Sequence, residues 1–140
     1  MVIRDAFSSV EISLRELGPR GTPADGDLGL DVATTGITFA GRNDTVWIGR
    51  DDWARFLQDV RALERTRSGE ARVGAMSPNE FELSIITVDR AGHIAAEGWV
   101  GREYVTRTGV LHDRVHFAVD IDPTDLPRLV SDLAAIARPG

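Results

Sequence analysis

The residues that could do chemistry in this chain are few, and their spacing argues against most reactions. Of the three histidines, His112 and His116 stand four residues apart. On a helix this spacing could clamp a metal ion, but the neighbouring residues alternate as in a strand, where four residues span about 13 Å. One ion cannot reach both side chains at that separation. The sequence therefore predicts no metal site.

The chain also lacks the sequence signatures of catalytic nucleophiles and of phosphate-binding loops. The chain has no cysteine, no Gly-x-Ser-x-Gly turn, no glycine-rich phosphate loop and no dinucleotide fingerprint. Carboxylates could pair across a sheet, Glu11 with Glu82 or Glu97 with Asp120, but acidic side chains on an exposed strand face are usually just solvated. We therefore expect no catalytic residue, no cofactor and no enzymatic activity. An active site without a known signature is the open alternative.

The tryptophans are more informative than the polar residues. Trp53 belongs to a helical apolar stripe and is predicted to be core. Trp47 and Trp99 instead fall on the parity opposite to the aliphatic residues of their strands, so they are expected on the opposite face. An exposed tryptophan among carboxylates is a common partner-binding arrangement. The predicted partner-binding residues are Trp47, Glu97, Trp99, His116 and Asp120. The alternative is that the 18–27 loop, a second layer or a dimer mate covers this face.

The elements that must position these residues follow from the hydrophobic pattern. Period-two alternation predicts short strands in these segments: 10–14, 28–32, 37–39, 46–48, 71–76, 81–85, 94–100 and 115–121. The tetrapeptide at 41–44 is predicted to be a turn, and residues 105–109 a loop. The first eight residues show no pattern.

Two helices are predicted from apolar stripes at helical spacing. The first runs from a cap at Asp51 and places apolar residues at positions 53, 56, 57, 60 and 63. The second is capped near Thr124, carries apolar residues at 126, 129, 130, 133 and 136, and ends at the segment 138–140. The two helices and the strands before them align at a constant offset of 73 residues. This alignment predicts an internal duplication with halves at about 8–68 and 78–138.

The predicted fold is therefore α+β. Two one-sided helices require a sheet face to cover, and short connections favour antiparallel neighbours. We expect one domain over residues 1–140, built on a twisted, mainly antiparallel sheet of about seven or eight strands, with both helices on one face.

Charge and composition limit the partners. The net charge of −6 argues against binding nucleic acid through its phosphates and permits a basic protein partner. Residues 70–140 hold 7 arginines against 11 acids, a larger acidic excess than in residues 1–69, which hold 9 against 11. No apolar run approaches the roughly 20 residues that cross a membrane, and the N-terminus lacks a secretion signal. The sequence predicts a cytoplasmic protein without a membrane partner.

Short motifs in the second half carry a family resemblance. They are Glu80-Phe81-Glu82-Leu83, Asp89-Arg90-Ala91-Gly92-His93-Ile94, Val115-His116-Phe117 and Thr124-Asp125-Leu126. In these motifs, and in the order of its strands and helices from about Leu28 onward, the chain resembles the WapI-type bacterial immunity proteins and similar uncharacterised actinobacterial domains. The motifs are structural, and none of their residues is catalytic.

The resemblance implies a non-enzymatic protein that binds and neutralises a cognate toxin, often a nuclease, and nucleases tend to be basic. It carries over no interface residues, because such interfaces vary with the toxin. Two other functions remain open from the residues alone. One is a structural or regulatory module that forms a homodimer through the Trp47 and Trp99 face, and the other is a small ligand carrier or enzyme with a pocket between sheet and helices.

Overall fold

The computed structural model describes residues 1–138, and eight strands and two α-helices make up its fold. In chain order these are β1 (Val2–Arg4), β2 (Ser9–Leu17), β3 (Leu28–Thr35), β4 (Ala40–Ile48), α1 (Arg50–Thr66), β5 (Glu70–Gly74), β6 (Phe81–Thr87), β7 (Ile94–Thr106), β8 (Gly109–Ile121), the short 3-10 turn η1 (Pro123–Asp125) and α2 (Leu126–Ile136). Every strand pair is antiparallel. The α+β class and the antiparallel pairing predicted from the sequence are confirmed.

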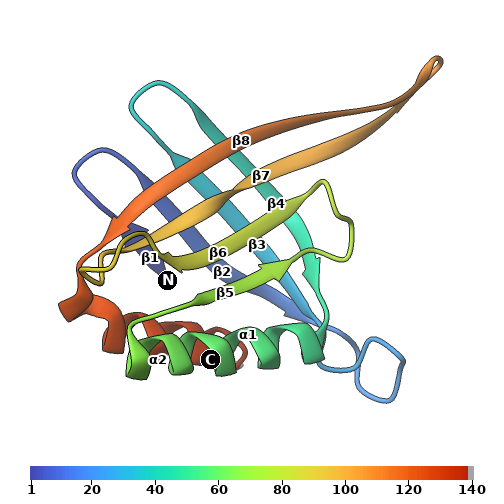
Figure 1. The fold of residues 1–140 in the computed structure, drawn as a ribbon. Helices are drawn as coiled ribbons and strands as arrows, with labels where there is room; N and C mark the ends of the chain where they lie inside the picture. Colours follow the sequence, from blue (N-terminus) through green and yellow to red (C-terminus); the bar gives the residue numbers. More distant parts are fainter. Residues whose placement is uncertain (139–140) are drawn as a thin grey trace.

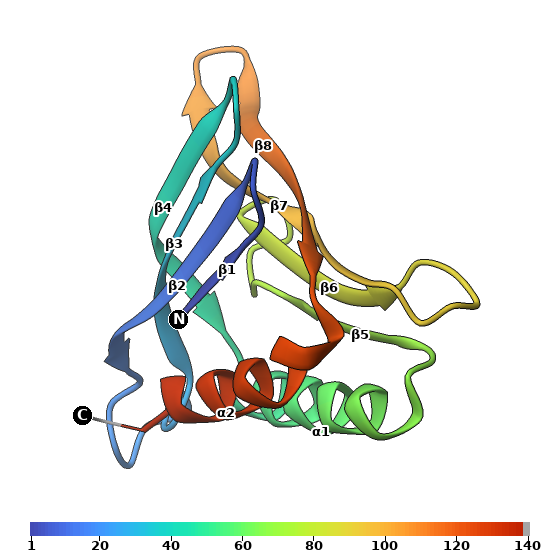
Figure 2. The same ribbon diagram turned by 90° about the vertical axis from the view of Figure 1, so that its left-hand side faces the viewer.

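The strands form two sheets, not the single sheet predicted. One sheet has the order β1-β2-β3-β4 and the other the order β5-β6-β7-β8. Within each sheet the strands are joined by loops of two to ten residues, whereas the 17-residue helix α1 separates β4 from β5. A connection of that length removes the hairpin geometry that would have paired β4 with β5. Figure 2 shows the two sheets meeting at one end and spreading apart at the other.

Both helices lie side by side across the open end between the sheets, as Figures 1 and 2 show. They share one side of the molecule as predicted, but they cover the gap between two sheets and not one face of a single sheet. The predicted stripes are confirmed as the buried faces. Trp53, Phe56, Val60 and Leu63 are buried from α1, and Leu126, Leu129, Val130, Leu133 and Ile136 from α2.

One apolar core joins both sheets and both helices. The inward residues of the strands, such as Val10, Leu30, Val46, Leu83 and Val119, are almost fully buried and belong to a single cluster with the helix stripes. A wedge between two sheets buries apolar surface only if something fills its open end. The helices fill this open end, and each Å² of apolar surface that they remove from water stabilises the fold by roughly 25 cal/mol.

The segment from Ile37 to Asp44 differs from the prediction. The expected short strand at 37–39 is the loop of the β3–β4 hairpin, where Ile37 is 80% exposed and Phe39 74% exposed. The expected turn at 41–44 lies inside β4, which contains a bulge opposite Asp31. Turn-forming residue types occur there because a bulge, like a turn, departs from regular strand geometry.

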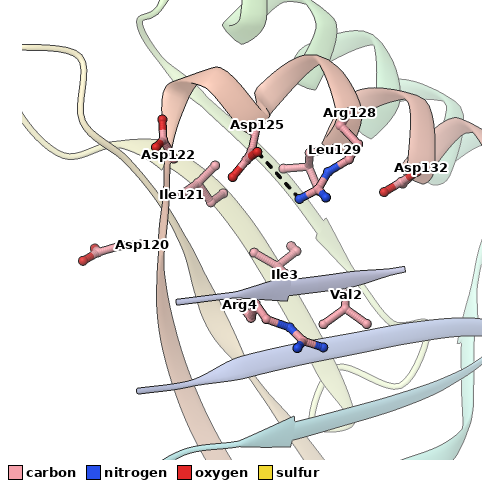
Figure 3. A pocket seen from close by; sticks show the side chains of 10 residues that line it. All are labelled: Val2, Ile3, Arg4, Asp120, Ile121, Asp122, Asp125, Arg128, Leu129 and Asp132. Carbon is pink, nitrogen blue, oxygen red and sulfur yellow. Dashed lines mark ion pairs between the residues drawn. The ribbon is translucent and has the colours of Figure 1, made fainter. Parts of the chain in front are cut away.

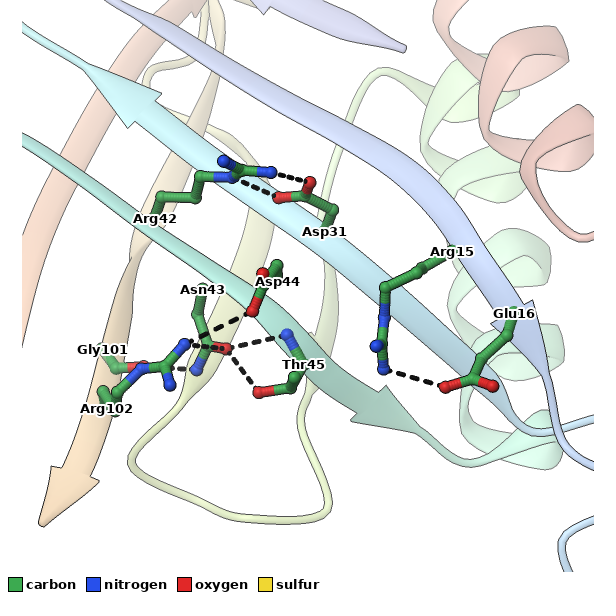
Figure 4. A network of polar contacts seen from close by, with 9 residues as sticks. All are labelled: Arg15, Glu16, Asp31, Arg42, Asn43, Asp44, Thr45, Gly101 and Arg102. Atoms are coloured by element: carbon green, nitrogen blue, oxygen red, sulfur yellow. Dashed lines mark hydrogen bonds and ion pairs between the residues drawn. The ribbon is translucent and has the colours of Figure 1, made fainter.

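Asn43, which pairs with Val32 next to this bulge, connects the first sheet to the second. Its side chain is buried, donates from Nδ2 to the carbonyl of Gly101 at 2.8 Å and accepts at Oδ1 from the backbone N–H of Thr45 at 2.9 Å. Arg102 also donates to Asn43 Oδ1, at 3.3 Å. Figure 4 shows this network between β4 and β7. A buried amide is stable only with such partners, so Asn43 fixes where β7 crosses β4.

The ends of the helices also differ in detail from the sequence prediction. Arg50 begins α1 after Gly49, one residue before the predicted cap Asp51. The cap of α2 is Asp125, one residue after Thr124, as predicted to within one position, and it makes no side-chain capping hydrogen bond. Asp122 caps the preceding turn η1, where it accepts from the backbone N–H of Thr124 at 2.9 Å. The last α-helical residue is Ile136, and residues 139–140 of the predicted helix stop lie outside the described residues.

Candidate functional site

Four of the five predicted partner-binding residues lie on the outer face of the second sheet. Glu97 and Trp99 project from β7, and His116 and Asp120 from β8. Trp99 stands directly opposite His116 in the ladder, and their ring centroids are 5.8 Å apart. Alternation puts these side chains on the face away from the buried Ala96, Val100 and Val119. The outer face of β7 and β8 is therefore the candidate site.

Trp99 is the centre of this face. The guanidinium carbon of Arg114 lies 4.5 Å from the Trp99 ring centroid, a cation–π arrangement worth about 0.5–1 kcal/mol at an exposed site. The indole N–H of Trp99 is shielded from solvent and has no hydrogen-bond partner within the described residues. A shallow hollow of about 430 Å³ lies beside the ring and includes Glu97, His116 and an ion pair between Arg72 and Glu82. A flat aromatic side chain beside charged groups suits protein recognition.

Trp47 is separated from the other four residues because β4 belongs to the first sheet. Its ring lies on the outer face of that sheet over Gly29, where a Cβ atom would approach the ring within 3.1 Å. Its carbonyl accepts a hydrogen bond from the backbone N–H of Met76 at 2.8 Å, which ties β4 to the segment after β5. The one-sheet prediction placed all five residues on one face, and the two-sheet arrangement divides them.

Asp120 marks the acidic end of the candidate site. A hollow of about 410 Å³ lies between β1, the end of β8 and α2, and Figure 3 shows the side chains that line it. Its aspartates are Asp120, Asp122, Asp125 and Asp132. Arg4 and Arg128 also line it, and Arg128 pairs with Asp125 at 3.7 Å. The acids outnumber the arginines, so this corner presents negative charge.

Asp5 joins the β1–β2 loop to this corner. Its carboxylate accepts from the backbone N–H groups of Asp120 at 2.9 Å, Phe7 at 2.7 Å and Ser8 at 2.8 Å. Burial alone would raise the pKa of the Asp5 carboxyl, but the backbone hydrogen bonds outweigh burial and lower the pKa. The Ser8 hydroxyl donates to the carbonyl of Ala118 at 2.9 Å. The loop therefore covers the edge of β8 at residues 118 and 120.

The β7–β8 hairpin extends beyond the rest of the molecule, as Figure 1 shows, and no hydrophobic pattern in the sequence predicts its length. Each strand has 13 residues, and the predicted loop at 105–109 is a two-residue turn, Arg107-Thr108, with the strand residues on either side of it. We call the part from Gly101 to Arg114 the arm. Its apolar side chains are exposed: Val105 at 88%, Val110 and Leu111 at 58% and Tyr104 at 45%. Exposed apolar pairs on a projecting hairpin are a feature of interaction surfaces.

A second apolar surface lies at the other end of β8. Phe7, Ile37 and Phe39 are exposed at the tips of the β1–β2 and β3–β4 loops. Together with residues 116–118 they line a recess of about 320 Å³. The sequence pattern missed this surface because Ile37 and Phe39 alternate as strand residues do, and alternation does not distinguish a strand end from a hairpin loop.

The described residues contain no group of three or more His, Asp or Glu side chains placed to hold a metal ion. Neither α-helix within residues 1–138 is long and apolar enough to cross a membrane. The chemistry that the outer face offers is recognition, through an aromatic ring, histidines and charges of both signs.

Comparison with known families agrees with a recognition role. The family model described as the immunity protein WapI-like family matches residues 2–139. The chain therefore belongs to the WapI-like immunity protein family, which implies a protein partner. Searches of curated proteins and of solved structures give no match.

Proposed function

We propose that this protein neutralises a bacterial toxin by binding it directly, and that it does so in the cytoplasm without catalysis. The observation that carries the proposal is the match of the immunity family model to nearly the whole chain, residues 2–139. The proposed mechanism is masking, in which the bound immunity protein covers the working surface of the toxin.

The outer face of β7 and β8 is the proposed contact surface. Trp99 supports this choice because a half-buried tryptophan between Arg114 and His116 can be covered by a partner with little loss of side-chain freedom. Glu97 and Asp120 are exposed on the same face and supply negative charge. The overall charge of −6 suits a basic toxin domain, which it would attract at long range.

The test uses the toxin domain encoded next to the gene for this protein. Cells that express this domain should survive only when the immunity protein is co-expressed, and the two purified proteins should form a complex in calorimetry. Failure of the wild-type protein to bind or protect would overturn the proposed function.

Trp99→Ala tests the proposed surface, with Trp47→Ala as its matched control on the other sheet. Trp99→Ala should weaken binding by about 10- to 100-fold, as loss of a central aromatic side chain does. Trp47→Ala should change binding by less than about three-fold. Equal losses in both variants would show that the interface includes the first sheet, and no loss with Trp99→Ala would place the interface elsewhere.

A further inference from the structure

The second sheet ends in an edge strand, β8. β8 is the last strand of the second sheet, and its pairing with β7 is unbroken from Ile121 to Gly109. In an antiparallel ladder, successive residues of an edge strand turn their backbone groups alternately toward the neighbour and away from it. The backbone N–H of Asp120 and the carbonyl of Ala118 point away, since they bond to Asp5 and Ser8 of the β1–β2 loop.

The same alternation identifies the exposed part of the edge. Because no bulge interrupts β8, residues 112, 114 and 116 direct their backbone groups to the same side as 118 and 120. The β1–β2 loop covers the edge only at 118 and 120. Within residues 1–138, no hydrogen bond reaches the backbone N–H groups of His112, Arg114 or His116. This segment also lacks proline, which natural edge strands use to prevent pairing.

The side chains on the two faces of this edge differ in character. On the outer face the edge presents His112, Arg114 and His116, all basic side chains. On the inner face lie Leu111, which is exposed, and Val115, which is half-buried against Gly41 of β4, on either side of Asp113. A strand added here would place its alternate side chains beside these two sets.

We propose that the edge of β8 from Val110 to His116 binds an extended strand of the toxin, which becomes a fifth strand of the second sheet. This inference rests on the proposed function and names the part of the toxin recognised. Acidic side chains of the added strand face Arg114 and the two histidines, and apolar side chains face Leu111 and Val115. Main-chain hydrogen bonds give affinity, and the alternating side chains give specificity. A locally acidic strand is compatible with a toxin domain that is basic overall.

A second copy of this protein fits the edge less well. Two identical strands related by a two-fold axis pair antiparallel, with one residue opposite itself. Registers centred on the free segment place His112, Asp113 or Arg114 opposite its own copy. Two carboxylates or two guanidinium groups directly opposite one another destabilise an antiparallel pair, so the registers centred on Asp113 and Arg114 are disfavoured and the edge favours a different protein.

The test compares His112→Pro with His112→Ala in binding to the adjacent toxin domain. Proline removes the outward N–H but no hydrogen bond to β7, whereas alanine keeps that N–H and removes only the side chain. His112→Pro should weaken binding by at least about 10-fold, and His112→Ala by less than about three-fold. Unchanged melting temperatures for both variants would show that neither loses the fold.

Hydrogen exchange of the wild-type complex gives an independent measurement that needs no variant. The amides of residues 112, 114 and 116 should become slow to exchange when the toxin domain binds. If the wild-type protein binds but these amides stay fast, or if both variants bind equally well, the edge is not the site, although the immunity function stands. A dimer of this protein alone that is lost in His112→Pro would assign the edge to a second copy and overturn the proposal.

Discussion

The two halves of the chain share one plan and differ in one hairpin. Each half is a four-stranded antiparallel meander followed by a helix. In the first half, the last two strands, β3 and β4, have 8 and 9 residues, whereas β7 and β8 in the second half have 13 each. The internal duplication predicted from the sequence would account for this shared plan. The extra residues of β7 and β8 form the arm.

The two hairpins also differ in how much of their apolar surface is buried. The inward residues of β3 and β4, such as Leu30 and Val46, are buried in the common core. Beyond Gly101 the arm has no residue in that core, and its apolar side chains remain exposed. A two-stranded hairpin standing alone is only marginally stable, so the arm adds little to stability. This agrees with the proposal that the β7–β8 hairpin contacts the toxin.

The largest expected effect contrasts the core with the arm. Phe56→Ala, at a fully buried position of α1, should lower the free energy of unfolding by about 3–5 kcal/mol, since it removes apolar contacts and leaves a cavity. Val105→Ala, in the arm, should change it by less than about 0.5 kcal/mol. Urea unfolding followed by circular dichroism measures both. Equal losses would mean that the arm is part of the stabilising structure.

The next largest loss of stability is expected where Asn43 holds the start of the arm. Asn43→Ala should cost about 1–3 kcal/mol, because it leaves the carbonyl of Gly101 and the N–H of Thr45 without the partners they have in the buried network. Asn79, which is half-buried, also contacts the arm, accepting from Arg114 and donating to Glu103 at 2.7 Å, but both hydrogen bonds are exposed to solvent. Asn79→Ala should cost less than about 0.5 kcal/mol. Thermal and urea unfolding of the two variants test whether burial decides the difference.

A smaller, pH-dependent effect is expected where the first half covers the edge of β8. The pKa of the Asp5 carboxyl is lowered in the folded protein, so the ionised form stabilises the fold. This contribution should be complete above the ordinary aspartate pKa of about 3.9 and be lost as the pH falls through the lower folded value. Asp5→Asn should therefore be less stable than the wild type at pH 6, and the gap should narrow toward pH 3. A gap that is constant with pH would mean that the charge of Asp5 is unimportant.

The smallest effect is expected from shortening the arm itself. Replacing residues 105–110 with Asn-Gly moves the two-residue turn back and keeps Tyr104 opposite Leu111. The free energy of unfolding should change by less than about 0.5 kcal/mol, since the most exposed apolar pair, Val105 and Val110, contributes nothing to the core. If the free energy of unfolding measured in urea fell by more than about 2 kcal/mol, the arm would be part of the stabilising structure, as β3 and β4 are.

Periodicity in the sequence was sufficient to predict the elements that bury apolar side chains. The stripe from Trp53 to Leu63 and the alternation of Phe81, Leu83 and Ile85 are buried as predicted. Among the features that the pattern missed, β1 has only a weak apolar pattern and the apolar side chains of the arm are exposed. Val2 and Ile3 are consecutive in a strand of only 3 residues, and the apolar residues of the arm do not face a core. Hydrophobic alternation reports burial, so it cannot reveal strands that bury little.

The side of its strand on which each candidate residue lies was predictable, but the sheet to which that strand belongs was not. Parity alone placed Trp99 opposite the aliphatic face of its strand, and Trp99, Glu97 and His116 share the outer face of the second sheet. Parity does not say which sheet a strand joins, so Trp47 was grouped with them although β4 lies in the other sheet.

By itself, the sequence determined the local elements, the α+β class and the side of each strand that is buried, because these depend on the residue order within a few positions. The tertiary structure decided that the strands divide into two sheets and that the helices fill the gap between them. It also decided that, within residues 1–138, no backbone group pairs with the outward edge of β8 between Val110 and His116. These features depend on contacts between residues far apart in the chain, such as Asn43 with Gly101 and Asp5 with Asp120. No local pattern encodes such contacts, because the two partners are far apart in the sequence.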